Sequence, residues 1–150
     1  MTTAYFETIQ MIERLHRHFL DVLKVELERK GVPDINNVQS MILYNIGDDE
    51  LTVGELTARG YYLGSNVSYN VKKMVENGYI LQERSVHDKR SFRVRLSDKG
   101  TELRDMITDM FARHEENLKN SELTPEVLNG AIDTMRMIER FWAQQTNLLR

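Results

Sequence analysis

The sequence predicts a mainly α-helical fold with one small β-hairpin, an α+β class of domain. Apolar residues recur with a helical period in several long segments, and two short segments of strand character flank a polar loop. Glycine, proline or helix-capping residues mark the boundaries between these segments. With 150 residues the chain has the length of one domain, and such a domain can bury a core without disulfide bonds. We therefore expect a single domain over residues 1–150.

The first expected element is a long amphipathic helix over residues 3 to about 30. Its isoleucine, leucine and phenylalanine residues recur every three or four positions, and Gly31 ends it. A second helix follows, with Asn36 or Asn37 as its N-cap, and it continues to Gly47. Both helices present an apolar stripe, so each is expected to pack against other parts of the protein.

A third, shorter helix begins at Thr52, three residues before Glu55. This spacing predicts a capping box, in which the Thr52 hydroxyl accepts from the amide of Glu55 and the Glu55 carboxylate accepts from the amide of Thr52. A break at Gly60 and Gly64 separates this helix from the next, which covers residues 65–77 and ends at a glycine.

Two strands are expected next, at residues 79–84 and 92–96, joined by the polar loop 85–91. A long helix then begins with Ser97 as its cap and runs to about residue 118. The last helix begins at Thr124, which a proline follows, and it carries an apolar face along its length. The order short helix, turn, helix and hairpin is that of a winged helix-turn-helix.

The net charge of −3 conceals a strong asymmetry along the chain. Residues 59–100 hold nine basic and four acidic side chains, a net charge of +5, which leaves −8 for the remainder. Binding to a polyanion requires lysine and arginine on the surface that meets the phosphates. A basic centre between acidic flanks therefore favours a protein that meets nucleic acid with one surface only. A chance cluster of solvated charges is the alternative.

The outer face of the helix at residues 65–77 is polar, while its inner face carries valines and a methionine. Asparagine can pair with adenine, serine with several base edges, and lysine with guanine or phosphate. We predict that this face contacts double-stranded DNA, although a solvated face is the alternative for any one residue. The predicted DNA-binding residues of this helix are Ser65, Asn66, Ser68, Tyr69, Asn70, Lys72 and Lys73.

The hairpin segment carries a family resemblance. Its sequence DKRSFRVRLSDKG, residues 88–100, resembles the D-x-R-S-x-x-V-x-L-(S/T)-x-x-G wing signature of the MarR family of bacterial transcriptional regulators. The segments at residues 55–58, 65–68 and 76–80 are similar to the helix-turn-helix of that family without a gap. The resemblance covers about residues 51–100 by motif and the whole chain by helix order.

The resemblance implies a homodimer in which the terminal helices interlock, at residues 1–35 and 98–150, and residues 36–97 form the DNA-binding lobe. It also implies that Arg90 enters the minor groove beside a pseudo-palindromic operator and that Asp88 fixes the direction of Arg90. A guanidinium loses its hydration readily, and narrow minor grooves concentrate negative potential. A simple surface ion pair is the alternative. The predicted DNA-binding residues of the hairpin are Asp88, Lys89, Arg90, Ser91 and Arg93.

Many family members are released from DNA by a small phenolic or aromatic acid, and the resemblance implies a repressor of this kind. Helical facing suggests that the effector pocket is lined by His16, Phe19, Tyr44 and Met110, with ordinary packing as the alternative for each. No metal is expected, because His16 and His18 are two residues apart on a helix and point to different sides.

Other classes of function find little support. The 150 residues contain no glycine-rich phosphate loop and no nucleophile motif, so we expect neither an enzyme nor a cofactor. The absence of cysteine excludes disulfides and thiol switches, and no segment approaches the roughly 18 apolar residues of a membrane span. We expect a cytoplasmic, bacterial protein without membrane contact. A winged-helix module that binds other proteins instead of specific DNA is the remaining alternative.

Overall fold

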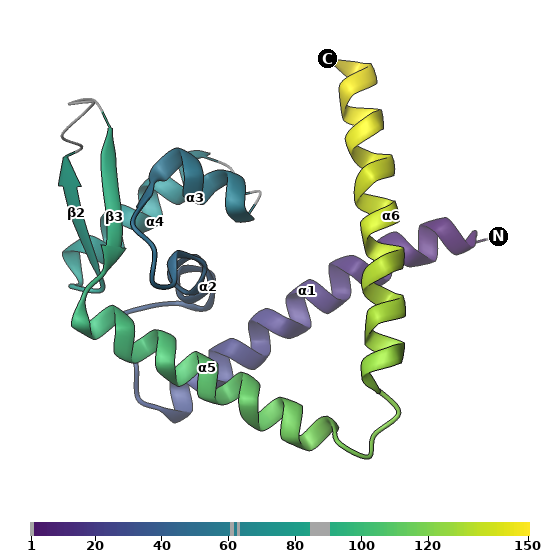
Figure 1. The fold of residues 1–150 in the computed structure, drawn as a ribbon, viewed down its shortest axis with the longest axis horizontal. Coiled ribbons are helices and arrows are strands. Elements are labelled where there is room, and N and C mark those ends of the chain that lie inside the picture. Colours follow the sequence, from purple (N-terminus) through teal and green to yellow (C-terminus); the bar gives the residue numbers. More distant parts are fainter. Residues whose placement is uncertain (1, 61, 63, 85–90) are drawn as a thin grey trace. The chain divides into compact units, whose positions relative to one another are not determined.

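The protein is described by a computed structural model, which covers residues 2–60, 62, 64–84 and 91–150 (Figure 1). It is mostly helical with a small antiparallel sheet, which confirms the predicted fold class. The chain forms two compact units, Met1–Thr108 and Asp109–Arg150. The predicted division into a DNA-binding lobe and dimerisation helices is a functional one, and it stays a prediction.

The first two helices begin and end where the sequence predicts. Helix α1 (Ala4–Arg29) begins at Thr3, whose hydroxyl accepts from the amide of Phe6. Helix α2 (Asn37–Ile46) has Asn36 as its N-cap, in a complete capping box with Gln39. Satisfying these free amides stabilises the first turn of each helix.

Helices α3 (Val53–Gly60) and α4 (Gly64–Glu76) form the helix-turn-helix. The Thr52 hydroxyl accepts from the amide of Glu55 at 3.1 Å, as predicted. The second half of the predicted capping box differs, because the Glu55 carboxylate accepts from the hydroxyl of Thr52, also at 3.1 Å. Thr52 itself belongs to a short strand, in which it is paired with Arg93.

That strand, β1 (Leu51–Thr52), is one that the sequence did not predict, because two residues are too few to show an alternating pattern. It pairs with β3 (Phe92–Leu96), which also pairs with β2 (Ile80–Arg84) in the predicted hairpin. The strand order is β1-β3-β2, and both pairings are antiparallel. Strand β1 directly precedes α3, so its pairing with β3 connects the start of α3 to the hairpin.

The core of the first unit lies among α2, α3, α4 and the sheet, which are drawn together in Figure 1. Its side chains come from each of these elements, so that neither the helices nor the hairpin could bury them alone. The fully enclosed apolar side chains include Leu43, Ile46, Leu56, Val67 and Val94.

Helix α5 (Asp98–Leu118) begins in the first unit and ends in the second. As predicted, Ser97 caps it, because the Ser97 hydroxyl accepts from the amide of Gly100 at 3.1 Å. In the second unit the chain turns and continues as α6 (Pro125–Leu149), whose N-cap is Thr124. No residue of α6 is buried in the single chain.

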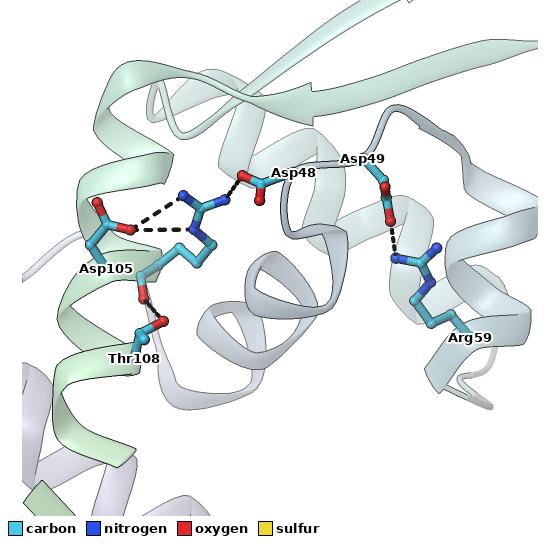
Figure 2. A network of polar contacts seen from close by, with 6 residues as sticks. Asp48, Asp49, Arg59, Asp105 and Thr108 are labelled. Carbon is cyan, nitrogen blue, oxygen red and sulfur yellow. Dashed lines mark hydrogen bonds and ion pairs between the residues drawn. The ribbon is translucent and has the colours of Figure 1, made fainter. Parts of the chain in front are cut away.

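Two carboxylates connect the ends of α2 to the first turns of α5. Asp34 lies before α2 and accepts from the ammonium group of Lys99 at 2.7 Å. Asp48 lies after α2 and pairs with the guanidinium of Arg104, which Asp105 contacts from another side (Figure 2). Helix α2 is therefore connected to α5 by an ion pair at each end. In the part of the chain described here, no helix is long and apolar enough to span a membrane.

The start of α5 passes so close to the hairpin that residue 100 must be glycine. A Cβ atom at Gly100 would lie 2.2 Å from the backbone carbonyl oxygen of Tyr79, which cannot rotate away. We expect Gly100→Ala to lower the free energy of unfolding by about 1–3 kcal/mol, the cost of forced overpacking. Urea unfolding monitored by circular dichroism measures this change.

Gly130→Ala is the matched control, since a Cβ atom there has no neighbour within 4 Å and the residue lies within α6. This substitution should raise the free energy of unfolding by roughly 0.5–1 kcal/mol, because alanine favours the helix. Equal stability of the two variants would contradict the close contact at Gly100.

Candidate nucleic-acid interface

Helix α4 has one buried and one exposed face, as the sequence predicts. Its inner stripe of Val67, Val71 and Met74 is at most 2% exposed and packs into the core of the first unit. Because this stripe fixes the rotation of the helix about its axis, the outer residues project away from the core. A helix in this arrangement can present its outer side chains to a groove of DNA.

Six of the seven predicted DNA-binding residues of α4 are exposed, namely Ser65, Asn66, Ser68, Tyr69, Lys72 and Lys73. Tyr69 is 61% exposed, and the ammonium group of Lys73 lies 5.8 Å from the centre of its ring. Lys73 also lies 3.7 Å from the carboxylate of Glu76. An exposed aromatic ring next to a cation offers both apolar and charged contacts to a base pair.

Asn70 is the exception, because it is half-buried and its side chain is held within the protein. Its amide oxygen accepts from the side chain of Gln39 at 3.1 Å, and its amide nitrogen donates to the carbonyl of Asn66 at 2.9 Å. Gln39 is also part of the capping box of α2. The structure thus gives Asn70 a connecting position between α4 and the start of α2.

The turn between α3 and α4 is organised by Tyr62, a residue that sequence reasoning did not select. Its amide donates to the carbonyl of Thr57 at 3.0 Å, and its hydroxyl contacts the side-chain nitrogen of Asn45 at 2.5 Å. Burial raises the pKa of Tyr62 above its ordinary value, so the hydroxyl is neutral at pH 7. The ring lies against Gly60, where a Cβ atom would come within 2.0 Å of it.

Arg59, at the end of α3, connects the start of the same turn to the end of α2. Its guanidinium donates to Asp49 at 2.8 Å (Figure 2). It also donates to the carbonyl oxygen of Asn45 at 3.0 Å. Both partners lie at or just after the end of α2. Free carbonyls at a helix end are satisfied in this way by a basic side chain, which also fixes α3 relative to α2.

The strands of the hairpin carry exposed basic residues. Arg93 is exposed on β3, and Arg95 pairs with Glu83 of β2 at 3.4 Å. The guanidinium of Arg84 lies 5.6 Å from the centre of the Phe92 ring. Ser91 is half-buried at the start of this region. The predicted wing residues Asp88, Lys89 and Arg90 lie outside the described residues, so their roles stay predictions.

The predicted effector residues are distributed over different elements. His16 is exposed on α1, while Phe19 of α1 and Tyr44 of α2 are half-buried. Met110 is buried and belongs to the second unit. The pocket that they were expected to form stays a prediction.

Cavities lie elsewhere in both units. One of about 390 Å³ in the first unit is lined by residues of the α1–α2 loop, Tyr79 and the start of α5. One of about 710 Å³ in the second unit lies at the turn between α5 and α6. Among the described residues, no group of three or more histidine, aspartate or glutamate side chains is placed to hold a metal ion.

Comparison with known proteins agrees with this geometry. The model of the MarR family matches residues 31–91. The chain is 40% identical over 139 residues to the exopolysaccharide II synthesis transcriptional activator ExpG of Rhizobium meliloti, covering 93% of this chain and 72% of that protein. This level of identity over most of both chains indicates common descent.

Solved structures share the fold at lower identity. FabT of Streptococcus pneumoniae, in complex with DNA, has a TM-score of 0.75 and 16% identity, covering 94% of this chain and 99% of that chain. MarR of Staphylococcus aureus, in complex with salicylate and kanamycin, has a TM-score of 0.72 and 22% identity, covering 92% and 91%. The family match, the relationship to ExpG and the shared fold together show that this chain belongs to the MarR family of transcriptional regulators.

Proposed function

We propose that the protein binds a pseudo-palindromic DNA operator as a homodimer, with α4 in the major groove and the hairpin at the adjacent minor groove. The observation that carries the proposal is the two-sided character of α4, buried on its valine and methionine stripe and exposed on its polar face. A single helix of this kind fits the major groove, and two copies related by a two-fold axis match a palindrome. The complex of FabT with DNA supports DNA as the ligand.

On α4, the exposed residues divide by chemistry. Ser65 and Asn66, near the start of the helix, carry donors and acceptors that can meet base edges. Lys72 and Lys73 carry charge, which suits phosphates. Tyr69 offers an apolar ring that suits the methyl group of thymine. We propose that Asn70 contributes by holding α4 against Gln39, in addition to any contact at the edge of the groove.

At the hairpin, we propose that Arg90 enters the minor groove, oriented by Asp88, and that Lys89, Ser91 and Arg93 contact the sugar-phosphate backbone. Arg93 is exposed on β3, so its side chain is free of the core. The support for the other residues is the sequence signature together with the pair of strands that flank it. The net charge of +5 over residues 59–100 suits a phosphate surface.

The direction of regulation has two candidates. We propose repression, relieved by a small aromatic acid. The complex of S. aureus MarR with salicylate supports an aromatic acid as the ligand. Activation is the second candidate, because ExpG is named a transcriptional activator. Either role places the protein in the bacterial cytoplasm, with the chromosome.

The DNA-binding proposal predicts a specific effect of Arg90. On a duplex selected from a random library by the protein itself, Arg90→Ala should weaken binding about 5- to 150-fold, the cost of a lost groove contact. Fluorescence anisotropy measures the affinity. Lys119→Ala is the control, because Lys119 lies in the α5–α6 turn and pairs with Glu116.

Binding by the unaltered protein should fall by roughly 100-fold between about 50 and 200 mM salt if four or more phosphates are contacted. A failure to bind any duplex would favour the protein-interaction module instead, and salt-independent binding would contradict contact with several phosphates.

The homodimer proposal rests on apolar side chains that are exposed in a single chain, on α1 at Phe6 and Leu15 and on α6 at Leu128, Ile132 and Phe141. Light scattering at micromolar concentration should give twice the chain mass of 17.6 kDa. Ile132→Asp should shift the mass towards the monomer, since a charge would be buried in the interface, whereas Ile132→Leu should not. A monomeric unaltered protein would contradict the proposal.

The effector proposal predicts that salicylate raises the melting temperature of the DNA-free protein and weakens its binding to the selected duplex. Both effects follow if the ligand binds the DNA-free conformation more tightly than the DNA-bound one. Differential scanning fluorimetry and anisotropy measure them, with benzyl alcohol as the uncharged control. A melting temperature that salicylate leaves unchanged would count against an aromatic acid as effector.

A further inference from the structure

A polar cluster surrounds the carboxylate of Asp34, in the loop between α1 and α2. One carboxylate oxygen accepts from the hydroxyl of Tyr79, and the other accepts from the ammonium group of Lys99 at 2.7 Å. The backbone carbonyl of Asp34 accepts from the side chain of Asn77 at 3.0 Å. These four residues, Asp34, Asn77, Tyr79 and Lys99, are called the Asp34 cluster below.

The three partners of Asp34 stand where α4 ends and where the hairpin begins and ends. Asn77 directly follows α4, Tyr79 directly precedes β2, and Lys99 lies in the first turn of α5, just after β3. The cluster therefore contains residues from both ends of the hairpin. A residue outside both the hairpin and the helix-turn-helix holds the junction between them.

Lys99 closes the base of the hairpin as well. Its ammonium group donates to the backbone carbonyl of Asn77 at 2.8 Å and lies 4.3 Å from the centre of the Tyr79 ring. The neighbouring Ser97 donates its amide to the carbonyl of Tyr79 at 3.0 Å and its hydroxyl to the carbonyl of Gly78 at 2.5 Å. Hydrogen bonds thus join the segment before β2 to the segment after β3 at the base of the hairpin.

The contacts at Asp34 are charge-assisted. Tyr79 is 3% exposed, so its hydroxyl requires an acceptor inside the protein. Lys99 foremost, and Tyr79 after it, lower the pKa of Asp34 below its ordinary value, while burial and Asp34 raise the pKa of Tyr79. At neutral pH a carboxylate therefore faces a neutral hydroxyl and an ammonium group, which is a stronger arrangement than a neutral pair.

We propose that Asp34 is a positioning residue for DNA binding, which fixes the direction of the hairpin relative to α4 from the loop between α1 and α2. The inference rests on the proposed function, in which α4 and the hairpin meet neighbouring grooves at the same time. A protein whose two elements must enter two grooves at once binds DNA more weakly if the angle between those elements can vary. The reason is that binding then has to restrict the angle, which costs free energy. The Asp34 cluster restricts that angle before DNA binds, in addition to the buried contacts between α4 and the sheet.

Asp48 provides a matched comparison within the same chain. Asp34 and Asp48 stand before and after α2, and each pairs with a basic residue of α5. The contacts of Asp48 involve Arg104 and do not include α4 or the hairpin among the described contacts. A loss of general stability would affect both variants, whereas a loss of hairpin direction would affect Asp34 alone.

The first of two measurements that test the inference requires no DNA. Hydrogen exchange of the full chain, followed by mass spectrometry, is compared for the unaltered protein, Asp34→Asn, Tyr79→Phe and Asp48→Asn. We expect the amides of β2 and β3 to exchange on the order of 3- to 10-fold faster in the first two variants, as the loss of one hydrogen bond implies. Exchange in α3 should be unchanged, and Asp48→Asn should leave β2 and β3 as they are.

The second measurement is the affinity for the duplex selected by the unaltered protein, over a range of salt concentrations. Asp34→Asn and Tyr79→Phe should weaken binding by roughly 5-fold or more and make its salt dependence shallower, because fewer phosphates are contacted together. A merely structural role would change the urea midpoint without changing the salt dependence. Asp48→Asn should bind as the unaltered protein does.

The outcomes separate the two proposals. Unchanged exchange in β2 and β3, with intact DNA binding by the unaltered protein, overturns the positioning role of Asp34 and leaves the proposed function in place. Equal effects of the Asp34 and Asp48 variants on exchange and salt dependence overturn it as well. Failure of the unaltered protein to bind any DNA contradicts the proposed function, and the exchange measurement then still decides whether Asp34 holds the hairpin.

Discussion

The burial of one face of α4 is the constraint on which the rest of the helix-turn-helix depends. Val67, Val71 and Met74 are enclosed by α2, α3 and the sheet, so the helix cannot rotate about its axis without exposing them. At roughly 25 cal/mol per Å² of apolar surface, the exposure of three such side chains costs several kcal/mol. The polar residues on the other face are thereby directed outwards, whatever partner they meet.

Polar contacts further restrict the positions of α3 and α4 relative to α2. A hydrophobic stripe fixes the rotation of the helix, and hydrogen bonds add the directional contacts that apolar packing does not provide. The bond between Gln39 and Asn70 adds a directional contact from α2 to α4, and the Arg59 contacts add one from α3 to the end of α2. The helix-turn-helix therefore combines a core that sets orientation with hydrogen bonds that set register.

The sequence alone predicts the local features of this fold well. Helix starts at Thr3, Asn36 and Thr124 follow from capping preferences that depend on a few neighbouring residues. Strand β1 could not be predicted, because it owes its existence to pairing with β3, about 40 residues away in the chain. The bond that the Glu55 carboxylate accepts differs from the prediction, because its donor is the Thr52 hydroxyl and Thr52 belongs to that strand.

The candidate site shows the same division between local and distant causes. The exposed face of α4 follows from helical periodicity, so six of its seven residues lie where they were predicted. The partners of Asn70 and of Asp34 come from other elements, and no spacing rule along the chain reveals such contacts. Their sequence signals are weak: a glutamine at the third position of a capping box, and an aspartate after a proline.

The turn between α3 and α4 has a consequence for how this protein can diverge. The ring of Tyr62 occupies the space that a side chain at residue 60 would need, and the Tyr62 hydroxyl is held by Asn45. Replacing Gly60 alone forces the ring away from Asn45, whereas a smaller residue at position 62 makes room for a larger one at position 60. A side chain at position 60 therefore requires a smaller residue at position 62 if the turn is to keep its present geometry.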